Sequence, residues 1–300
     1  MTIEEQIKKL TKERNAIILA HNYQRPEVQD IADFLGDSLG LSQQAANTDA
    51  DVIVFCGVHF MAETAAILSP EKTVLLPDSN AGCPMANMIS ARQLDEAKRK
   101  TANAAVVCYV NSTAEVKALS DVCCTSSNAV SIVDSFPKDR EILFVPDASL
   151  GRYVEKQLDR KLILWPGYCP THHRVLLEQI VRLREQYPRA RVVVHPECTE
   201  DIIDTADHVA STSGILKYCR ESDAETFLIG TEMGILHRLR KESPGKTFVQ
   251  LSPFVDCPNM KLITLEKILW ALEDMDNRVT VSEPTASQAR KAIDRMLELS

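Results

Sequence analysis

An internal repeat constrains the fold of this chain more than any other feature of its sequence. A stretch of about 25 residues at 17–41 recurs without a gap at 105–129 and at 191–215. Four columns of equivalent residues keep their register at separations of 86 or 88 residues. These columns are His21, Tyr109 and His195; Asp33, Asp121 and Asp207; Ser38, Ser126 and Thr212; and Cys83, Cys169 and Cys257. The period exceeds the roughly 20–50 residues of a solenoid unit and predicts three small related domains.

Each unit alternates short apolar runs with helical patterns. Runs such as Val52–Phe55, Ala105–Tyr109 and Ile142–Val145 are apolar throughout, which is typical of parallel strands covered on both faces. We therefore predict an α/β fold of three homologous three-layer α/β/α domains with short parallel sheets of about four strands. Pseudo-threefold symmetry would place their equivalent loops around one central site. Chance similarity between generic strand–turn–helix units is the alternative, and it explains four columns in register poorly.

The repeat also sets the expected domain boundaries. The first unit should span residues 1–88, the second 89–174 and the third 175–263. The remaining segment, 264–300, repeats the opening helix-strand pattern and is a candidate to pack back on the first unit. No linker rich in glycine and serine separates the units, so we expect them to pack compactly.

Composition excludes several classes of protein. The net charge is −8 without a lysine or arginine tract, so neither a nucleic acid nor an anionic membrane is an expected partner. The chain has no apolar run of membrane-spanning length, and its acidic first residues do not resemble a signal peptide. Ten glycines form no phosphate-binding fingerprint, which argues against a nucleotide cofactor. Nine cysteines, an odd number, favour a cytoplasmic protein whose thiols pack, bind metal or catalyse.

Two of the columns carry polar groups at strand ends, where parallel sheets bind ligands. The first column follows the first strand of each unit, and the hydroxyl column opens a helix. Converging helix N-termini with Ser38, Ser126 and Thr212 would bind a small acid with carboxylate or phosphate groups. Plain N-capping is the alternative, and it is the commoner role for one such residue taken singly.

The cysteine column is the most specific local signal. Cys83, Cys169 and Cys257 are each followed by proline, as is the last cysteine of ferredoxin-type clusters. Three thiolates suit Zn²⁺ with either water or a nearby histidine, His172 or His173, as the fourth ligand. They also suit a [4Fe–4S] cluster with one open iron that acts as a Lewis acid. Six cysteines are not expected to be ligands: Cys56, Cys108, Cys123, Cys124, Cys198 and Cys219.

Other residues are candidates for proton transfer. Glu197 lies beside His195 at a strand end, which suits an acid–base pair, although a solvated loop carboxylate is the alternative. Tyr23 and Tyr109 are candidates to donate protons or orient a substrate, and packing is their alternative role. Two further classes remain open: a zinc-dependent lyase or hydrolase, and a cluster-bearing redox or iron sensor, which the lack of a DNA-binding signal disfavours.

The motifs that carry these residues resemble those of the quinolinate synthase family over nearly the whole chain and in the same order. They include AHNYQ at 20–24, GDSL at 36–39, FMAE at 60–63, CPMANM at 83–88, YVNST at 109–113, TSSNAV at 125–130, CPTH at 169–172, HPEC at 195–198, STSG at 211–214, IGTE at 229–232 and CPNM at 257–260. Tyr168 and Ser127 depart from the family pattern beside the expected contacts.

The resemblance implies an iron–sulfur enzyme of de novo NAD biosynthesis. Such an enzyme condenses iminoaspartate with dihydroxyacetone phosphate to quinolinate, releases phosphate and two waters, and receives iminoaspartate from an aspartate-oxidising enzyme. One [4Fe–4S] cluster per chain would lie at the centre, held by the three column cysteines and leaving one iron open. The implied substrate contacts are His21, Ser38, Tyr109, Val110, Asn111, Ser126, His195, Pro196, Glu197 and Thr212.

We assign expected roles among these residues as follows. Glu197 is the expected base at carbon. His21, His195 and Tyr23 are expected to handle carbonyl and hydroxyl protons. Two residues should orient the iminoaspartate-derived carbons, Tyr109 and Asn111, and two should hold carboxylates, Ser126 and Thr212.

Overall fold

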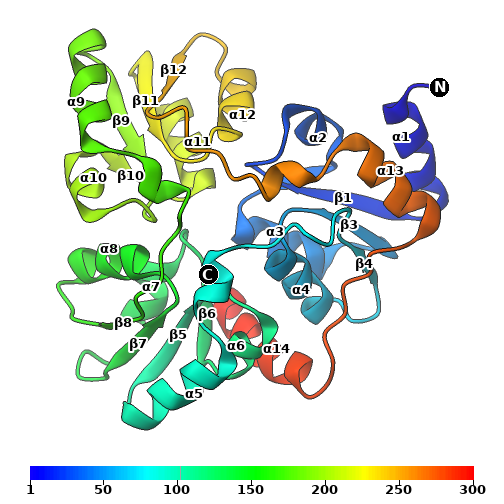
Figure 1. The fold of residues 1–300 in the computed structure, drawn as a ribbon, viewed down its shortest axis with the longest axis horizontal. Coiled ribbons are helices and arrows are strands. Elements are labelled where there is room, and N and C mark those ends of the chain that lie inside the picture. Colours follow the sequence, from blue (N-terminus) through cyan, green and yellow to red (C-terminus); the bar gives the residue numbers. More distant parts are fainter. Residues whose placement is uncertain (102) are drawn as a thin grey trace.

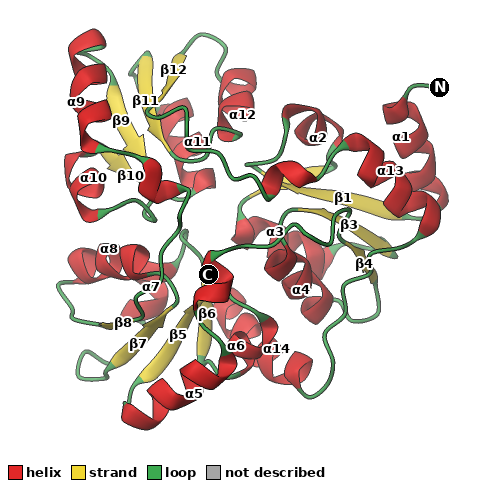
Figure 2. Ribbon diagram, viewed as in Figure 1, coloured by secondary structure: helices red, strands yellow, loops and turns green. Residues whose placement is uncertain are grey.

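The computed structural model describes residues 1–101 and 103–300 and contains three separate four-stranded parallel sheets. In each sheet the first strand of the unit lies between its second and third strands, and the fourth strand is at the edge. Figures 1 and 2 show these sheets around a common centre, each flanked by its own helices. The predicted class of three α/β units with short parallel sheets is therefore confirmed, while the symmetry relation between them stays a prediction.

The elements follow the repeat along the chain. The first unit comprises α1 (Ile3–Glu13), β1 (Ala16–His21), α2 (Pro26–Ile31), β2 (Phe34–Gly36), α3 (Ser38–Asn47), β3 (Val52–Cys56), α4 (His59–Leu68), β4 (Thr73–Leu75) and the 3-10 helix η1 (Met85–Met88). The second comprises α5 (Ala91–Lys100), β5 (Ala105–Tyr109), α6 (Ala114–Ala118), β6 (Val122–Cys124), α7 (Ala129–Asp134), β7 (Ile142–Val145), α8 (Ala148–Leu158), β8 (Ile163–Leu164) and η2 (His172–Arg174). The third comprises α9 (Leu177–Gln186), β9 (Arg191–Val194), α10 (Glu200–Thr205), β10 (His208–Val209), α11 (Thr212–Glu221), β11 (Thr226–Gly230), α12 (Ile235–Glu242), β12 (Thr247–Gln250) and η3 (Met260–Leu262).

The aspartate column has a structural role that is the same in all three units. Asp33 accepts a hydrogen bond from the backbone N–H of Ile18 at 2.8 Å. Asp121 bonds the N–H of Val106 at 2.7 Å, and Asp207 bonds that of Val192 at 2.8 Å. Each aspartate precedes the second strand of its unit and accepts from a backbone N–H of the first strand. The column therefore stabilises the pairing of the first two strands in each unit and has a structural role.

The last helices pack on two different units. Helix α13 (Leu265–Asp274) contacts α1 and β3 of the first unit. The chain then passes antiparallel to Leu75 at the end of β4. Helix α14 (Thr285–Glu298) lies chiefly against α6 and β6 of the second unit, with α4 as a further neighbour (Figure 1). Of the segment 264–300, which was predicted to pack on the first unit, α13 contacts that unit and α14 contacts chiefly the second. Within the described residues, no helix is long and apolar enough to span a membrane.

A buried lysine connects the first two units. Lys117 of α6 has no exposed surface, and its Nζ donates to the Phe60 carbonyl at 3.1 Å and to Thr64 Oγ1 at 2.9 Å, both on α4. Burial lowers the pKa of Lys117, and the nearby Glu63 carboxylate opposes that shift.

Replacing this lysine should destabilise the protein. Lys117→Ala removes the ammonium that donates to Thr64 Oγ1 and one of the donors to the Phe60 carbonyl, which keeps its bond from Thr64 Oγ1 at 2.8 Å. The substitution also opens a cavity, so we expect the free energy of unfolding to fall by roughly 3 kcal/mol. Chemical denaturation measures the change, and the exposed Lys100 at the end of α5 provides the matched control, Lys100→Ala. Equal stability of the two variants would contradict this role for Lys117.

Candidate active site

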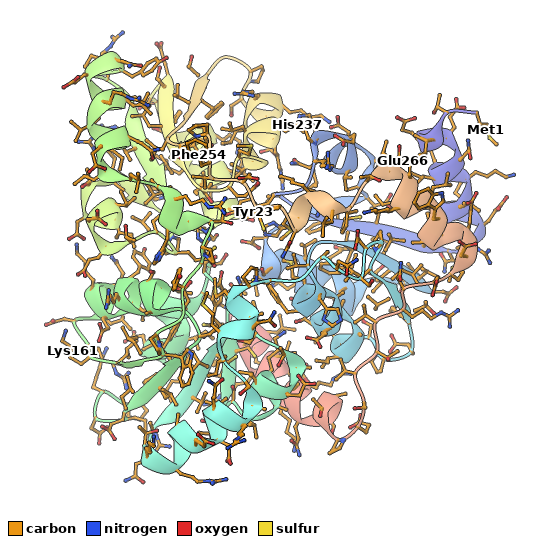
Figure 3. All side chains as sticks on the ribbon, in the orientation of Figure 1. Met1, Tyr23, Lys161, His237, Phe254 and Glu266 are labelled. Carbon is orange, nitrogen blue, oxygen red and sulfur yellow. The ribbon has the colours of Figure 1, made fainter. Side chains whose placement is uncertain are left out.

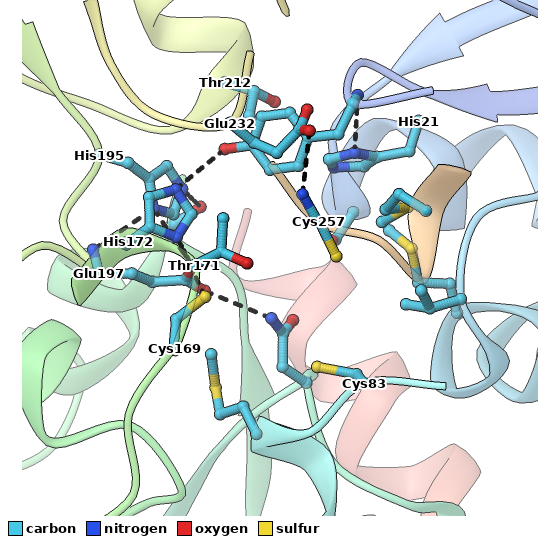
Figure 4. A pocket seen from close by; sticks show the side chains of 18 of the residues that line it. His21, Cys83, Cys169, Thr171, His172, His195, Glu197, Thr212, Glu232 and Cys257 are labelled. Atoms are coloured by element: carbon cyan, nitrogen blue, oxygen red, sulfur yellow. Dashed lines mark hydrogen bonds and ion pairs between the residues drawn. The ribbon is translucent and has the colours of Figure 1, made fainter. Parts of the chain in front are cut away.

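One pocket at the meeting point of the three units collects most of the predicted site residues. It is lined by His21, Tyr23, Ser38, Cys83, Tyr109, Asn111, Ser126, Cys169, His195, Glu197, Thr212 and Cys257. Figure 4 shows side chains from the three units facing one another across this pocket, and Figure 3 places Tyr23 near the centre of the molecule. Of the predicted contacts, Val110 and Pro196 do not line it, although both are buried beside residues that do.

The three cysteines occupy the same local structure in each unit. Cys83, Cys169 and Cys257 each precede a proline and a 3-10 helix, η1, η2 or η3. The first residues of each turn direct backbone N–H groups at the sulfur, and these donors stabilise a thiolate. Burial raises the pKa of Cys83 to about 12, and the N–H groups of Ala86 and Met85 oppose that rise.

The spacing of the thiols discriminates between the two metal hypotheses. Within the described residues, the single group of three potential ligands whose donor atoms all lie within 4.8 Å of one another is Cys169, His172 and Glu197. At least one pair of the three column sulfurs is therefore more than 4.8 Å apart, which is wider than the roughly 3.8 Å expected around one tetrahedral zinc with 2.3 Å bonds. A cluster that receives each thiolate on a different iron accommodates the wider spacing. The donor set fits a [4Fe–4S] cluster.

The histidines named as possible zinc ligands have other partners. His172 Nδ1 lies 2.7 Å from Glu197 Oε2 and 3.1 Å from Cys169 Sγ. Since Glu197 can only accept when ionised, the Nδ1 proton of His172 faces the carboxylate while this contact is made. His173 lies outside the pocket, stacked on Tyr168, with its Nε2 2.9 Å from Ser149 Oγ.

Glu197 has three side-chain partners in the pocket. Its Oε1 accepts from the Tyr109 hydroxyl at 2.6 Å and from Asn111 Nδ2 at 3.3 Å, while Oε2 faces His172. Burial favours the neutral acid, but the adjacent His172 and the hydrogen bonds from His172 and Tyr109 outweigh it and hold the pKa of Glu197 well below its usual range. The carboxylate is therefore ionised in a buried site.

His21 and His195 have the same protonation pattern. The backbone N–H two residues on donates to ring Nδ1 in both cases, from Tyr23 at 3.2 Å and from Glu197 at 3.3 Å. Burial lowers the pKa of His21 to about 4 and that of His195 to about 3, so both rings are neutral near pH 7. With Nδ1 accepting, the proton resides on Nε2 of each ring. The Nε2–H of His195 donates to Ser126 Oγ at 3.2 Å, whereas that of His21 has no protein acceptor in the described part of the chain.

Tyr23 belongs to a second buried hydrogen-bonded set. Its hydroxyl pairs with Thr231 Oγ1, and Thr231 Oγ1 lies 2.9 Å from His172 Nε2. Burial raises the pKa of Tyr23 well above its ordinary value, with the Glu197 charge adding to the rise. Tyr23 thus remains a phenol whose proton is held by Thr231 and His172, the same imidazole that bonds Glu197.

The hydroxyl column does not cap its helices. Asp37 caps α3 by accepting from Gly40 N at 3.0 Å, and Ser211 caps α11 by accepting from Gly214 N at 3.2 Å. Ser38 and Thr212 are the first helical residues after these caps, so plain N-capping is wrong for both. Their hydroxyls remain available to the pocket, which they line together with Ser126.

Several residues of the pocket were not singled out as substrate contacts by sequence reasoning. They are Asp37, Val58, Phe60, Met61, Gly82, Met85, Thr171, His172, Glu232 and Met260. Two signals could have identified some of them. Glu232 follows the third strand of its unit, a ligand-binding position in parallel sheets. Met85 and Met260 both follow a Cys-Pro pair.

Comparison with known proteins agrees with this geometry. The model of the family described as quinolinate synthetase A protein matches residues 5–298. The chain is 56% identical to a quinolinate synthase of Geobacter metallireducens over 298 residues, covering 99% of this chain and 98% of that protein. It is 53% identical to a quinolinate synthase of Methanosarcina barkeri over 293 residues, covering 98% and 96%. A quinolinate synthase of Desulforudis audaxviator is 55% identical over 294 residues, covering 98% and 97%. The chain belongs to the quinolinate synthase family.

Proposed function

We propose that this protein condenses iminoaspartate with dihydroxyacetone phosphate to quinolinate, releasing phosphate and two waters. The atoms balance, because the four carbons of the imine and the three of the triose phosphate give the seven carbons of quinolinate. The observation that carries the proposal is that three cysteines from three units line one pocket with an ionised Glu197 and two neutral histidines. Family membership supports the same reaction.

The three cysteines would hold a [4Fe–4S] cluster, one per chain. When bound, a cluster with three protein ligands supplies an open iron that polarises a substrate oxygen or nitrogen and assists dehydration. The backbone N–H groups of the 3-10 helices would stabilise the thiolates of Cys83, Cys169 and Cys257. The chain's own residues bind, orient and move protons around that centre.

Proton transfer at carbon is assigned to Glu197. A carboxylate with so low a pKa is a weak base, and it gains basicity when a donor leaves it. The Tyr109 hydroxyl, now 2.6 Å from Oε1, can turn to a substrate oxygen and so release part of this stabilisation. The Nε2–H groups of His21 and His195 would donate to carbonyl or hydroxyl oxygens, and Tyr23 would give or take a proton through Thr231 and His172.

Asn111 offers a site for the substrate nitrogen. Its Nδ2 donates to Glu197, which fixes the direction of the amide, and its Oδ1 is buried without a partner in the described part of the chain. A buried acceptor without a donor is unfavourable, so a ligand N–H is the expected partner. The imine nitrogen of iminoaspartate has that proton. Ser38, Ser126 and Thr212 would hold the carboxylates.

The setting of the reaction follows from the chemistry of its substrate and cofactor. Iminoaspartate hydrolyses readily in water, and an enzyme that oxidises aspartate would supply it close to its point of use. Free thiols and a cluster are compatible with a reducing cytoplasm. We propose both as the context of this enzyme.

Anaerobic purification tests the proposal. We expect a brown protein with about four irons and four sulfides per chain, and formation of quinolinate from iminoaspartate and dihydroxyacetone phosphate. A colourless zinc protein would support the lyase or hydrolase alternative. A cluster protein whose spectrum is unchanged by dicarboxylates and which forms no quinolinate would support the sensor alternative.

A further inference from the structure

A chain of directed hydrogen bonds leads from the surface of the third unit to the pocket. Arg238 of α12 donates from Nη1 to Asn22 Oδ1 at 2.7 Å and to the Leu35 carbonyl at 3.0 Å. Asn22 Nδ2 donates in turn to Thr212 Oγ1 at 2.9 Å. Asn22 belongs to the first unit, whereas Arg238 and Thr212 belong to the third, so the chain crosses their interface twice.

The direction of every bond in this chain is fixed by chemistry. A guanidinium has donors only, so it selects the oxygen of the Asn22 amide and turns the NH₂ group toward Thr212. Arg238 is itself held by Glu242, which accepts from Nε at 2.5 Å. Asn22 has no exposed surface, and Thr212 is 2% exposed. The amide therefore cannot turn over without burying an unpaired donor against the guanidinium.

The Thr212 hydroxyl is consequently restricted to donating its proton. Because its oxygen accepts from Asn22, its own O–H proton points elsewhere, and within the described residues no protein acceptor is bonded to it. Thr212 lines the pocket, and its side chain is among those drawn in Figure 4. We propose that Arg238 and Asn22 are positioning residues that make the Thr212 hydroxyl an obligate donor to a carboxylate of the bound dicarboxylate. This inference rests on the proposed function and names the groups that select an anion at that subsite.

The interface around Arg238 supplies a matched control. His237 and Lys241, on the same helix, both contact Asp30 of α2, with Lys241 Nζ 2.8 Å from the carboxylate. Figure 1 shows α12 facing α2 across this boundary. Lys241 thus joins the same two units as Arg238 without a bond to Asn22. Substituting Lys241 therefore measures the effect of a weakened interface without a change at Asn22.

The decisive variant is Asn22→Asp, which keeps the shape of the side chain and pairs a carboxylate with Arg238. An aspartate can only accept, so the Thr212 proton turns toward it and presents a lone pair to the ligand. Calorimetry should show quinolinate binding the holoenzyme roughly 10- to 100-fold more weakly, the range for a lost hydrogen bond to a charged group. We expect KM to rise by a similar factor with kcat largely retained, and thermal stability to be unchanged or increased.

Further variants distinguish the effect of hydrogen-bond direction on quinolinate binding from the effects of charge and of a disturbed interface. Thr212→Val should weaken binding by a similar factor, and adding Asn22→Asp to it should have no further effect. Arg238→Met should weaken binding, Arg238→Lys should restore it in part, and Lys241→Met should leave it unchanged. Undiminished binding by Asn22→Asp, or effects of Asn22→Asp and Thr212→Val that multiply, would overturn the relay. Wild-type protein that fails to bind quinolinate would overturn the proposed function as well, whereas normal wild-type binding with an unaffected Asn22→Asp variant overturns the relay alone.

Discussion

Cys169→Ala should yield a folded protein that contains no [4Fe–4S] cluster and forms no quinolinate. The residue precedes η2 and lines the shared pocket, and the two remaining thiols, Cys83 and Cys257, come from other units. Each thiolate is needed because a cluster held by two cysteines loses both charge neutralisation and its fixed position. Iron and sulfide analysis and the visible absorbance of anaerobically purified protein measure the loss independently of turnover.

A buried cysteine outside the pocket is the matched control. Cys56 ends β3, has no exposed surface and does not line the site. Cys56→Ala should retain full iron and sulfide while losing about 1 kcal/mol of stability through lost packing. A Cys169→Ala variant with the iron content of the wild type would refute the ligand assignment.

Glu197→Gln should retain the cluster and lower turnover by roughly 10²- to 10⁴-fold, the usual contribution of a general base. The substitution is expected to fold normally, because a glutamine can present its carbonyl to His172 and its amide to the Tyr109 oxygen, which accepts as well as donates. The amide of Asn111, which donates to Glu197 Oε1, turns over so that its unpartnered Oδ1 accepts from the glutamine. The loss therefore reports the missing charge and the missing proton acceptor rather than a collapsed site.

The control for this variant is a carboxylate of the same unit. Glu200, exposed at the start of α10, lies outside the pocket, and Glu200→Gln should leave turnover unchanged. Iron content is measured for both proteins. Turnover in Glu197→Gln equal to that of the wild type would remove Glu197 from the base role and leave it a purely structural acceptor for Tyr109 and His172.

The repeat made much of the fold predictable. Apolar runs at a common period identified the parallel strands, and residues at their carboxyl ends were expected to meet because parallel strands end at one edge. The structure brings twelve of the predicted site residues into one pocket on that basis. The aspartate column shows the limit of the argument. The regular spacing of these aspartates did not indicate what they do. Their hydrogen bonds to N–H groups of the first strands are seen only in the three-dimensional structure.

Helix α14 and the hydroxyl column illustrate a second limit. An amphipathic segment does not specify which unit covers its apolar face, and α14 lies chiefly on α6 and β6 because those surfaces are available there. Similarly, the helices α3 and α11 are capped by Asp37 and Ser211, one residue before Ser38 and Thr212. The backbone dihedral angles decide which of two adjacent residues is the cap, and the sequence does not give them.

The sequence by itself determined the three α/β units, the three Cys-Pro pairs and most of the pocket, because these follow from local period and from strand ends. Only the tertiary structure decided the protonation and hydrogen-bond direction of the site. Bonds from His172 to Glu197, from Asn22 to Thr212 and from Arg238 to Asn22 join residues of different units. Their partners are set by how the units pack, since residues separated by 25 to 216 positions meet at hydrogen-bond distance. The sequence repeat of 86 or 88 residues does not show which residues of different units form these hydrogen bonds.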